Sequence, residues 1–208
     1  MGVNMIIIGV TGGMGAGKSR VLAYLEEKWS ARTIRLDDIS RSLLAKNGLC
    51  YEETIHIFGE KIIMPDGNLN RPMIAKMIFE DTGLRDRLNS LVHPAVKAEV
   101  RWIAEEMRQL DAGLLVLEAA LLIEGGYREI CDELWYIYAD EKVRRERLKE
   151  SRGYTDERIS GTFATQLSDE SFRTHVDFVI DNSGAFEDTA AVIDNHLKNL
   201  FTNERSIT

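Results

Sequence analysis

An α/β fold, with a five-stranded parallel sheet in the middle of three layers, is predicted by two observations. Short apolar runs rich in β-branched and aromatic residues alternate along the chain with segments of helical periodicity. Runs that are apolar on both faces are typical of parallel strands buried between two layers of helices. The expected strands are Met5–Val10, Thr33–Leu36, Leu114–Leu117, Leu134–Tyr138 and Phe178–Ile180.

The first expected strand leads directly into a glycine-rich turn. Gly12-x-x-x-x-Gly17-Lys18-Ser19 follows the strand, and an amphipathic helical pattern starts near Ser19. Glycine at positions 12, 15 and 17 permits positive φ and close approach of an anion, and a helix N-terminus favours negative charge. Strand, turn, Lys-Ser and helix in this order predict a P-loop and the P-loop NTPase fold. A plain turn joining a strand to a helix is the alternative.

P-loop chemistry assigns a role to each residue of this turn. Backbone N–H groups cradle the phosphates of ATP, Lys18 reaches the β- and γ-phosphates, and the Ser19 hydroxyl binds Mg²⁺. Glu118, at the end of the third expected strand, is a further candidate contact to Mg²⁺ through water. The predicted ATP-binding residues of the loop are Gly12, Gly13, Met14, Gly15, Ala16, Gly17, Lys18 and Ser19.

Composition limits the class of protein. The 208 residues are 44% hydrophobic, enough for one good core with room for an inserted subdomain. A net charge of −8 argues against a protein that coats nucleic acid or an anionic membrane. Cys50 and Cys131 are too far apart for a metal site or a disulfide framework, and the apolar run Met5–Val10 is too short for a signal or a membrane span. We therefore expect a cytoplasmic protein, a monomer or a small homo-oligomer.

The segment between the second and third expected strands is too long for a simple crossover. Its helical patterns predict an acceptor-binding helical insertion over 38–112 within a single kinase domain that spans 1–208. The turn signal Pro65-Asp66-Gly67-Asn68 divides it, and Pro94 is expected in the first turn of a new helix. The expected helices are Ile39–Lys46, Tyr51–Phe58, Arg71–Phe79 and Leu84–Leu110.

A second long segment, 141–173, is dense in basic residues. This density predicts a mobile helical lid that closes over phosphates, with Gly153 where a hinge could lie. The alternative is a solvated helix with i,i+4 ion pairs such as Glu141 with Arg145. The basic residues are Lys142, Arg144, Arg145, Arg147, Lys149, Arg152, Arg158 and Arg173.

The absence of motifs typical of other P-loop proteins limits the reactions that this loop could serve. The sequence has no Asn-Lys-x-Asp motif of a GTPase, and Leu114–Leu117 ends in Glu118 alone rather than in the paired acids of a motor ATPase. A small-molecule kinase needs an acid beside the acceptor hydroxyl, and Asp37 or Asp38 could supply it. Their alternative role is capping of the helix that follows. A nucleoside monophosphate kinase and a non-catalytic nucleotide switch stay open as other functions.

Nearly the whole chain resembles the dephospho-CoA kinase family. Gly9 to Ser19 resembles the family's Gly-Leu-Thr-Gly-Gly-Ile-Gly-Ser-Gly-Lys-Ser, and 35–41 resembles its Asp-Ala-Asp-x-x-x-Arg, with Arg35 in place of the first aspartate. Leu91-Val92-His93-Pro94 is similar to its Leu-x-His-Pro. Ala120 to Glu124 resembles Pro-Leu-Leu-Phe-Glu, with alanine in place of proline. Further similar motifs are Leu69-Asn70-Arg71-Pro72 with Ile78-Phe79, the lid residues Arg147, Arg152 and Gln166, and Asp181-Asn182-Ser183-Gly184.

The resemblance implies phosphorylation of the ribose 3′-hydroxyl of dephospho-CoA by ATP and Mg²⁺, which gives CoA and ADP in the last step of CoA biosynthesis. It implies Asp37 as the base. Lys18 and Arg152 then neutralise charge on the transferred group, and Arg147 contacts ATP. The implied acceptor-binding residues are Arg41, Arg71 and His93.

Overall fold

A computed structural model describes residues 5–109 and 113–204 of the chain. The chain divides into two compact units. The sheet unit consists of Met1–Ile34 and Arg108–Thr208, and the helical unit is Arg35–Met107. The helical unit therefore contains most of the segment 38–112, of which residues 110–112 lie outside the described residues.

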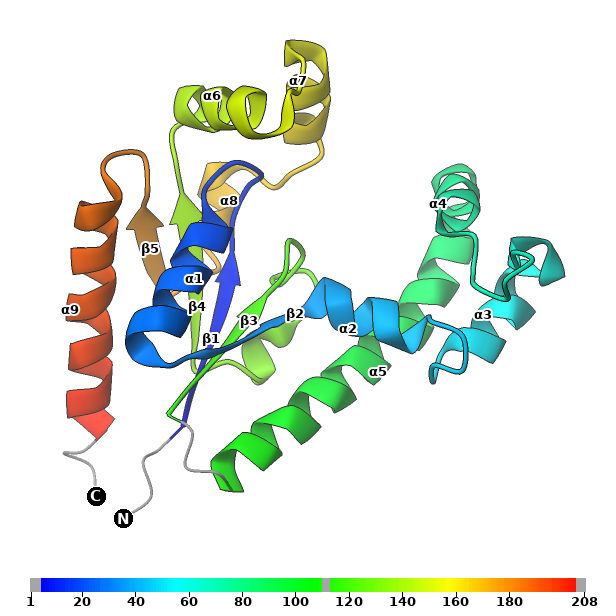
Figure 1. Ribbon diagram of the computed structural model, residues 1–208, viewed down its shortest axis with the longest axis horizontal. Helices are drawn as coiled ribbons and strands as arrows, with labels where there is room; N and C mark the ends of the chain where they lie inside the picture. The colour runs from blue at the N-terminus through cyan, green and yellow to red at the C-terminus, as the bar shows by residue number, and fades with distance from the viewer. Residues whose placement is uncertain (1–4, 110–112, 205–208) are drawn as a thin grey trace. The chain divides into compact units, whose positions relative to one another are not determined.

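The sheet has five strands in the order β2-β3-β1-β4-β5, and the predicted α/β fold with a parallel sheet is confirmed (Figure 1). β1 lies at the centre, where Ile8 pairs with Val116 of β3 on one side and with Glu133 of β4 on the other. Each strand lies within one or two residues of its predicted range. The strands are β1 Ile6–Thr11, β2 Arg32–Arg35, β3 Leu114–Glu118, β4 Glu133–Tyr138 and β5 Phe178–Asp181.

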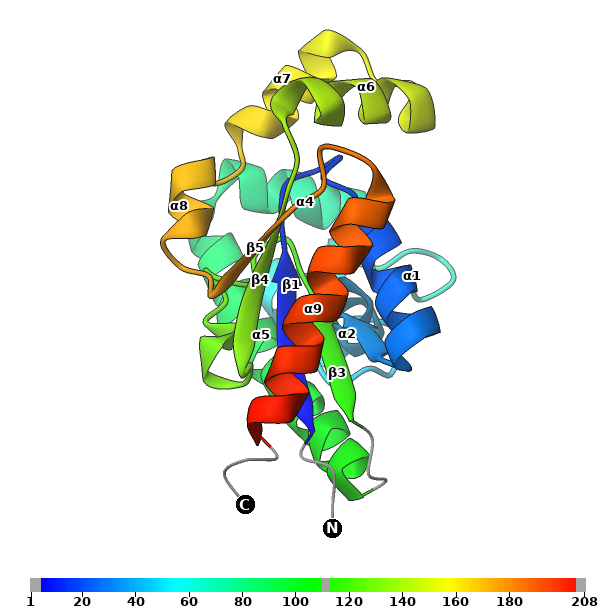
Figure 2. The same ribbon diagram turned by 90° about the vertical axis from the view of Figure 1, so that its left-hand side faces the viewer.

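Helices cover both faces of the sheet. α1 (Lys18–Trp29) and α9 (Phe186–Glu204) lie on one face, as both views show (Figures 1 and 2). Their buried side chains pack against alternate residues of the strands. On the other face, Phe172 of α8 (Asp169–Arg173) stacks on Tyr136 of β4 with ring centroids 4.5 Å apart. The shared core on the α1 and α9 face includes Ile8, Val10, Leu25, Trp135, Ile137 and Leu197.

The segment 141–173 forms three short helices, of which the first two lie above the carboxyl ends of β1 and β4, while the third, α8, packs on a face of the sheet. β4 leads into α6 (Glu141–Arg152), which is followed by α7 (Asp156–Ala164) and α8 (Figure 1). Gly153 ends α6 in the left-handed conformation with φ 62°, so the chain turns sharply between α6 and α7. This turn places α6 and α7 side by side.

The helical unit has its own core, which Tyr51, Phe58, Ile62, Leu69 and Ile74 form. The Asn70 side chain accepts a hydrogen bond from the Met73 backbone N–H and so caps the helix that starts at Arg71. The helices are α2 Leu36–Leu43, α3 Tyr51–Phe58, α4 Arg71–Glu80 and α5 Thr82–Gln109. Among the described residues, none of the helices combines the length and apolar character needed to cross a membrane.

Two local predictions in this unit are wrong. Pro94 lies inside α5 rather than in the first turn of a new helix. The buried stripe of Val92, Val96 and Val100 runs past Pro94, and its burial outweighs the one backbone hydrogen bond that proline removes. α2 starts at Leu36, so Asp37 and Asp38 lie in its first turn and do not cap it. The predicted end of α5 at Leu110 lies outside the described residues.

Candidate functional site

The glycine-rich turn has the backbone that the sequence predicts. Gly12, Gly15 and Gly17 have positive φ angles of 150°, 83° and 93°. A side chain at Gly12 would also collide with the backbone oxygen of Ile137 in β4. Glycine is therefore required at this turn by both conformation and space, as expected for a loop whose backbone surrounds an anion.

Lys18 reaches back across the loop that precedes it. Its Nζ donates a hydrogen bond to the Gly12 backbone oxygen at 2.7 Å and lies 3.9 Å from Oε1 of Glu118. The side chains of Lys18 and Glu118 are only 15% and 19% exposed. The ammonium is thus held inside the loop, where it faces any anion that the loop binds.

Two oxygen donors flank Lys18. Ser19 is the next residue along α1 and is exposed, and Glu118 ends β3. A hydroxyl and a carboxylate are ligands that Mg²⁺ accepts, and this cation commonly keeps water ligands and phosphate oxygens beside few protein ligands. The donor set at this edge of the sheet therefore fits the predicted magnesium ion.

Arg147 of α6 and Asn182, which follows β5, both form hydrogen bonds to the backbone of the loop. Asn182 is 2% exposed, and its Nδ2 donates to the backbone oxygen of Ala16 at 2.8 Å. Arg147 donates to the backbone oxygens of Asn182 at 2.8 Å and of Ala16 at 3.4 Å. The predicted ATP-binding residue Arg147 therefore contacts the loop directly at Ala16. It also contacts the loop indirectly through Asn182, a buried residue that follows β5.

Arg144, one helical turn before Arg147, also contacts the loop. Its Nε donates to the Met14 backbone oxygen at 2.9 Å, and its terminal nitrogen donates to Gln166 Oε1 at 2.6 Å. Burial lowers the pKa of its guanidinium from the ordinary value. Arg144, Gln166 and Asn182 are not among the predicted site residues. The last two lie in family-like motifs, whereas nothing in the sequence distinguishes Arg144 from its basic neighbours.

Other arginines of the segment 141–173 have local partners. Arg145 donates to Glu141 Oε1 at 2.8 Å, which is the i,i+4 pair considered as the alternative to a lid function. Arg152, the last residue of α6, is exposed and its guanidinium lies 5.9 Å from the Tyr154 ring centroid. The structure thus brings Arg144 and Arg147 to the loop and leaves Arg152 beside Tyr154.

The predicted acceptor residues belong to the helical unit. Asp37 is exposed in the first turn of α2, and His93 is exposed on α5. Arg71 donates to the backbone oxygen of Arg41 at 3.0 Å, and Arg41 forms an ion pair with Asp38 at 2.8 Å. These contacts bring Arg41 and Arg71 together at the end of α2.

Both cysteines are free and buried. Burial raises the pKa of the Cys131 thiol to about 12, and it also raises the pKa of Cys50. Since the thiolate is the reactive form of cysteine, a raised pKa and burial are typical of packing residues rather than of nucleophiles.

Comparisons with known proteins show the family to which the chain belongs. The chain matches the family model described as dephospho-CoA kinase over residues 6–188. A dephospho-CoA kinase of Symbiobacterium thermophilum is 34% identical over 91% of this chain and 79% of its own length.

Two solved structures are similar. The crystal structure of TT1252 from Thermus thermophilus has a TM-score of 0.78 and 29% identity, and the match covers 95% of this chain and 98% of that one. A shikimate kinase from Acinetobacter baumannii, 16% identical with a TM-score of 0.50 over 97% of this chain and 96% of its own, has the same fold.

Proposed function

Because the chain belongs to the dephospho-CoA kinase family, we propose that it transfers the γ-phosphoryl group of ATP to the ribose 3′-hydroxyl of dephospho-CoA. The products are CoA and ADP, and the reaction is the last step of CoA biosynthesis. The observation that carries the proposal is the family match over residues 6–188, which includes both the phosphate-binding loop and the acceptor residues of the helical unit.

The loop binds the phosphates of ATP. The backbone N–H groups from Gly12 to Lys18 surround the anion, and the N-terminus of α1 adds partial positive charge. Lys18 neutralises charge on the β- and γ-phosphates. Ser19, and Glu118 through water, would hold the Mg²⁺ ion, which supplies charge neutralisation and orientation of the phosphates when bound.

Asp37 is the proposed base. Its carboxylate accepts the proton of the 3′-hydroxyl while the ribose oxygen forms a bond to the γ-phosphorus, and the bond from the γ-phosphorus to the bridging oxygen of ADP breaks. Arg41, Arg71 and His93 bind and orient the acceptor from the same unit. All three side chains are exposed, which supports their assignment to a ligand-binding surface.

Charge on the transferred group is neutralised by Lys18 and by lid arginines. Arg147 is supported by its contacts to the loop, and Arg152 by its place in the family-like lid pattern. We assign both to phosphate binding, Arg147 before closure of the lid and Arg152 after it.

The acidic charge of −8 and the small-molecule substrates support a protein that works in the cytoplasm without nucleic acid or membrane, as a monomer or a small homo-oligomer. Size-exclusion chromatography with light scattering measures the oligomeric state. A mass above a few protomers would contradict this part of the proposal.

The test is ADP production from ATP and Mg²⁺ with and without dephospho-CoA, with CoA identified by mass. Adenosine monophosphate and shikimate are the control acceptors, because a nucleoside monophosphate kinase is the alternative that the sequence leaves open and a shikimate kinase has the same fold. We expect strong stimulation by dephospho-CoA alone. Stimulation by another acceptor would assign a different small-molecule kinase, and slow hydrolysis without any productive acceptor would favour a nucleotide switch.

A further inference from the structure

The backbone of Met14, at the apex of the phosphate-binding loop, is held on both sides by side chains from the segment 141–173. Its oxygen accepts from Arg144 Nε at 2.9 Å, and its N–H donates to Gln166 Oε1 at 3.4 Å. Arg144 also donates to the same Gln166 oxygen at 2.6 Å. The three residues therefore form a closed set of hydrogen bonds, which we call the Met14 clasp.

The Arg144 side chain is fixed in this position by packing as well as by hydrogen bonds. Its guanidinium lies 4.0 Å from the ring centroid of Phe163 in α7, so the aromatic face covers the cation. On the loop side, a Cβ atom at Gly13 would overlap the same guanidinium. Arg144 thus fills the space between α7 and the loop, and the absence of a side chain at Gly13 makes that space.

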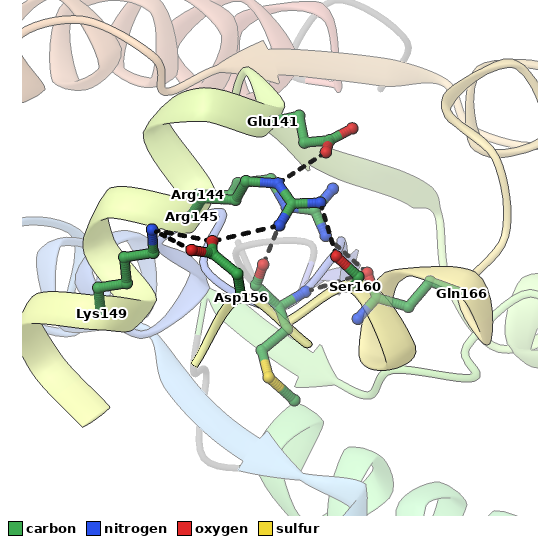
Figure 3. A network of polar contacts seen from close by, with 8 residues as sticks. Glu141, Arg144, Arg145, Lys149, Asp156, Ser160 and Gln166 are labelled. Carbon is green, nitrogen blue, oxygen red and sulfur yellow. Dashed lines mark hydrogen bonds and ion pairs between the residues drawn. The ribbon is translucent and has the colours of Figure 1, made fainter. Parts of the chain in front are cut away.

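Arg145, the next residue, shows that these contacts are specific to Arg144. Its guanidinium bonds to Glu141 at 2.8 Å and to Ser160 at 3.1 Å, and it lies 3.7 Å from Asp156. These partners all belong to α6 and α7. Figure 3 shows the two arginines leaving α6 beside each other and reaching different partners. Arg145 therefore joins the two lid helices to each other, whereas Arg144 joins them to the loop.

We propose that Arg144 and Gln166 are positioning residues for nucleotide binding, which hold the peptide groups on both sides of Met14 and so make the shape of the phosphate-binding loop depend on docking of α6 and α7. The inference rests on the proposed kinase function and adds residues that position its phosphate-binding loop. A bidentate arginine is suited to this task, because its planar fork fixes an angle between two acceptors that a lysine cannot fix.

The test measures ADP affinity by calorimetry and hydrogen exchange of the loop peptide 12–17, without acceptor. Arg144→Met removes the donors and keeps an apolar stem against Phe163, and we expect ADP affinity to fall roughly 10- to 100-fold with faster exchange in the peptide. Arg144→Lys keeps the charge and should recover little of the affinity. The matched control is Arg145→Met, which should bind ADP within about twofold of the natural protein.

A double-mutant cycle with Gln166→Ala tests whether Arg144 and Gln166 depend on each other in supporting ADP binding. If they do, Arg144→Met and Gln166→Ala together weaken ADP binding about as much as either alone. Additive effects, unchanged exchange in Arg144→Met, or natural affinity in Arg144→Lys would each overturn the proposal. These readouts need no turnover, so a negative CoA assay would contradict the proposed function and leave the result on the clasp standing.

The variants also separate positioning from transition-state chemistry. At saturating ATP, kcat of Arg144→Met should fall much less than its ADP affinity, because the clasp contacts backbone and not the reacting atoms. A fall in kcat with unchanged affinity would instead place Arg144 among the catalytic residues and contradict the proposal.

Discussion

The glycine-rich loop and the proposed acceptor residues of the helical unit differ in how their polar groups are held. Lys18, Arg144 and Arg147 donate to the backbone oxygens of Gly12, Met14 and Ala16 in the loop, respectively. In the helical unit, Asp37 and His93 are exposed, Arg71 donates to the backbone oxygen of Arg41, and Arg41 pairs with Asp38. The side chains around the loop are thus fixed by hydrogen bonds to its backbone, whereas the proposed acceptor residues are exposed, and fixing an exposed side chain on binding has an entropic cost.

The largest effect should come from Asp37→Asn, which tests whether an exposed residue carries the chemistry. An amide cannot accept the acceptor proton as a carboxylate does, so kcat should fall roughly 100- to 10,000-fold. ADP affinity, measured by calorimetry, should stay within about twofold because the loop is unchanged. Asp38→Asn is the matched control and should change kcat far less. A near-normal kcat in Asp37→Asn would remove Asp37 from the role of base.

Lys18→Ala tests the glycine-rich loop, whose polar groups are fixed by hydrogen bonds. Loss of the ammonium that lies across Gly12 should lower kcat on the order of 100- to 1000-fold and should weaken ADP binding in the same assay. Lys142→Ala, an exposed residue of α6, is the control for loss of one positive charge. If Lys18→Ala lowered only the affinity for the acceptor, the assignment of the loop to ATP would be wrong.

Arg71→Gln should affect binding of one substrate alone. Removal of a charge near Arg41 should raise the KM for dephospho-CoA about 10-fold, while the KM for ATP stays unchanged. Lys76→Gln on the same helix, where Lys76 pairs with Glu80, is the control. An equal rise in both KM values would contradict a role of Arg71 in binding the acceptor alone.

The smallest expected effect is on how the stability of the sheet unit changes as the pH falls. Burial would raise the pKa of Asp194 in α9, but hydrogen bonds from Tyr24 and Trp29 and the Lys28 ammonium hold it below the ordinary value. A carboxyl with a lowered pKa stabilises the fold above its unfolded pKa of about 4, and this contribution is lost as pH falls through the folded value.

Asp194→Asn should therefore lower the stability at pH 7 by about 1 kcal/mol and flatten the fall of Tm with acid. The exposed Asp188→Asn, also on α9, is the control. Thermal unfolding between neutral pH and acid measures both. Parallel Tm profiles for the natural protein and Asp194→Asn would show that Asp194 does not contribute in this way.

Local signals predicted much of this molecule. The five strands and the loop from Gly12 to Ser19 follow from apolar runs and glycine spacing, which are properties of short segments. The predictions of the start of α2 and of the position of Pro94 were wrong. At both places the burial of an apolar stripe outweighs the local preference for a cap or for a first turn.

The contacts that the sequence could not reveal join distant residues. Arg144 and Met14 are separated by 130 residues, and Gln166 and Met14 by 152. Their meeting depends on the parallel order of the strands, which places the segment after β4 beside the segment after β1. A pattern of charges within α6 does not show which of its arginines turns toward the loop.

The contacts of the phosphate-binding loop cannot all form during synthesis until Asn182 has been made. The residue lies 166 positions after Ala16, whose oxygen it binds, and β1 pairs with β3 and β4, which are also made much later. The ribosome therefore releases the whole glycine-rich motif long before its supports exist. A nascent chain that stops before β5 contains an intact P-loop sequence and lacks the side chain that fills the space beside Gly17.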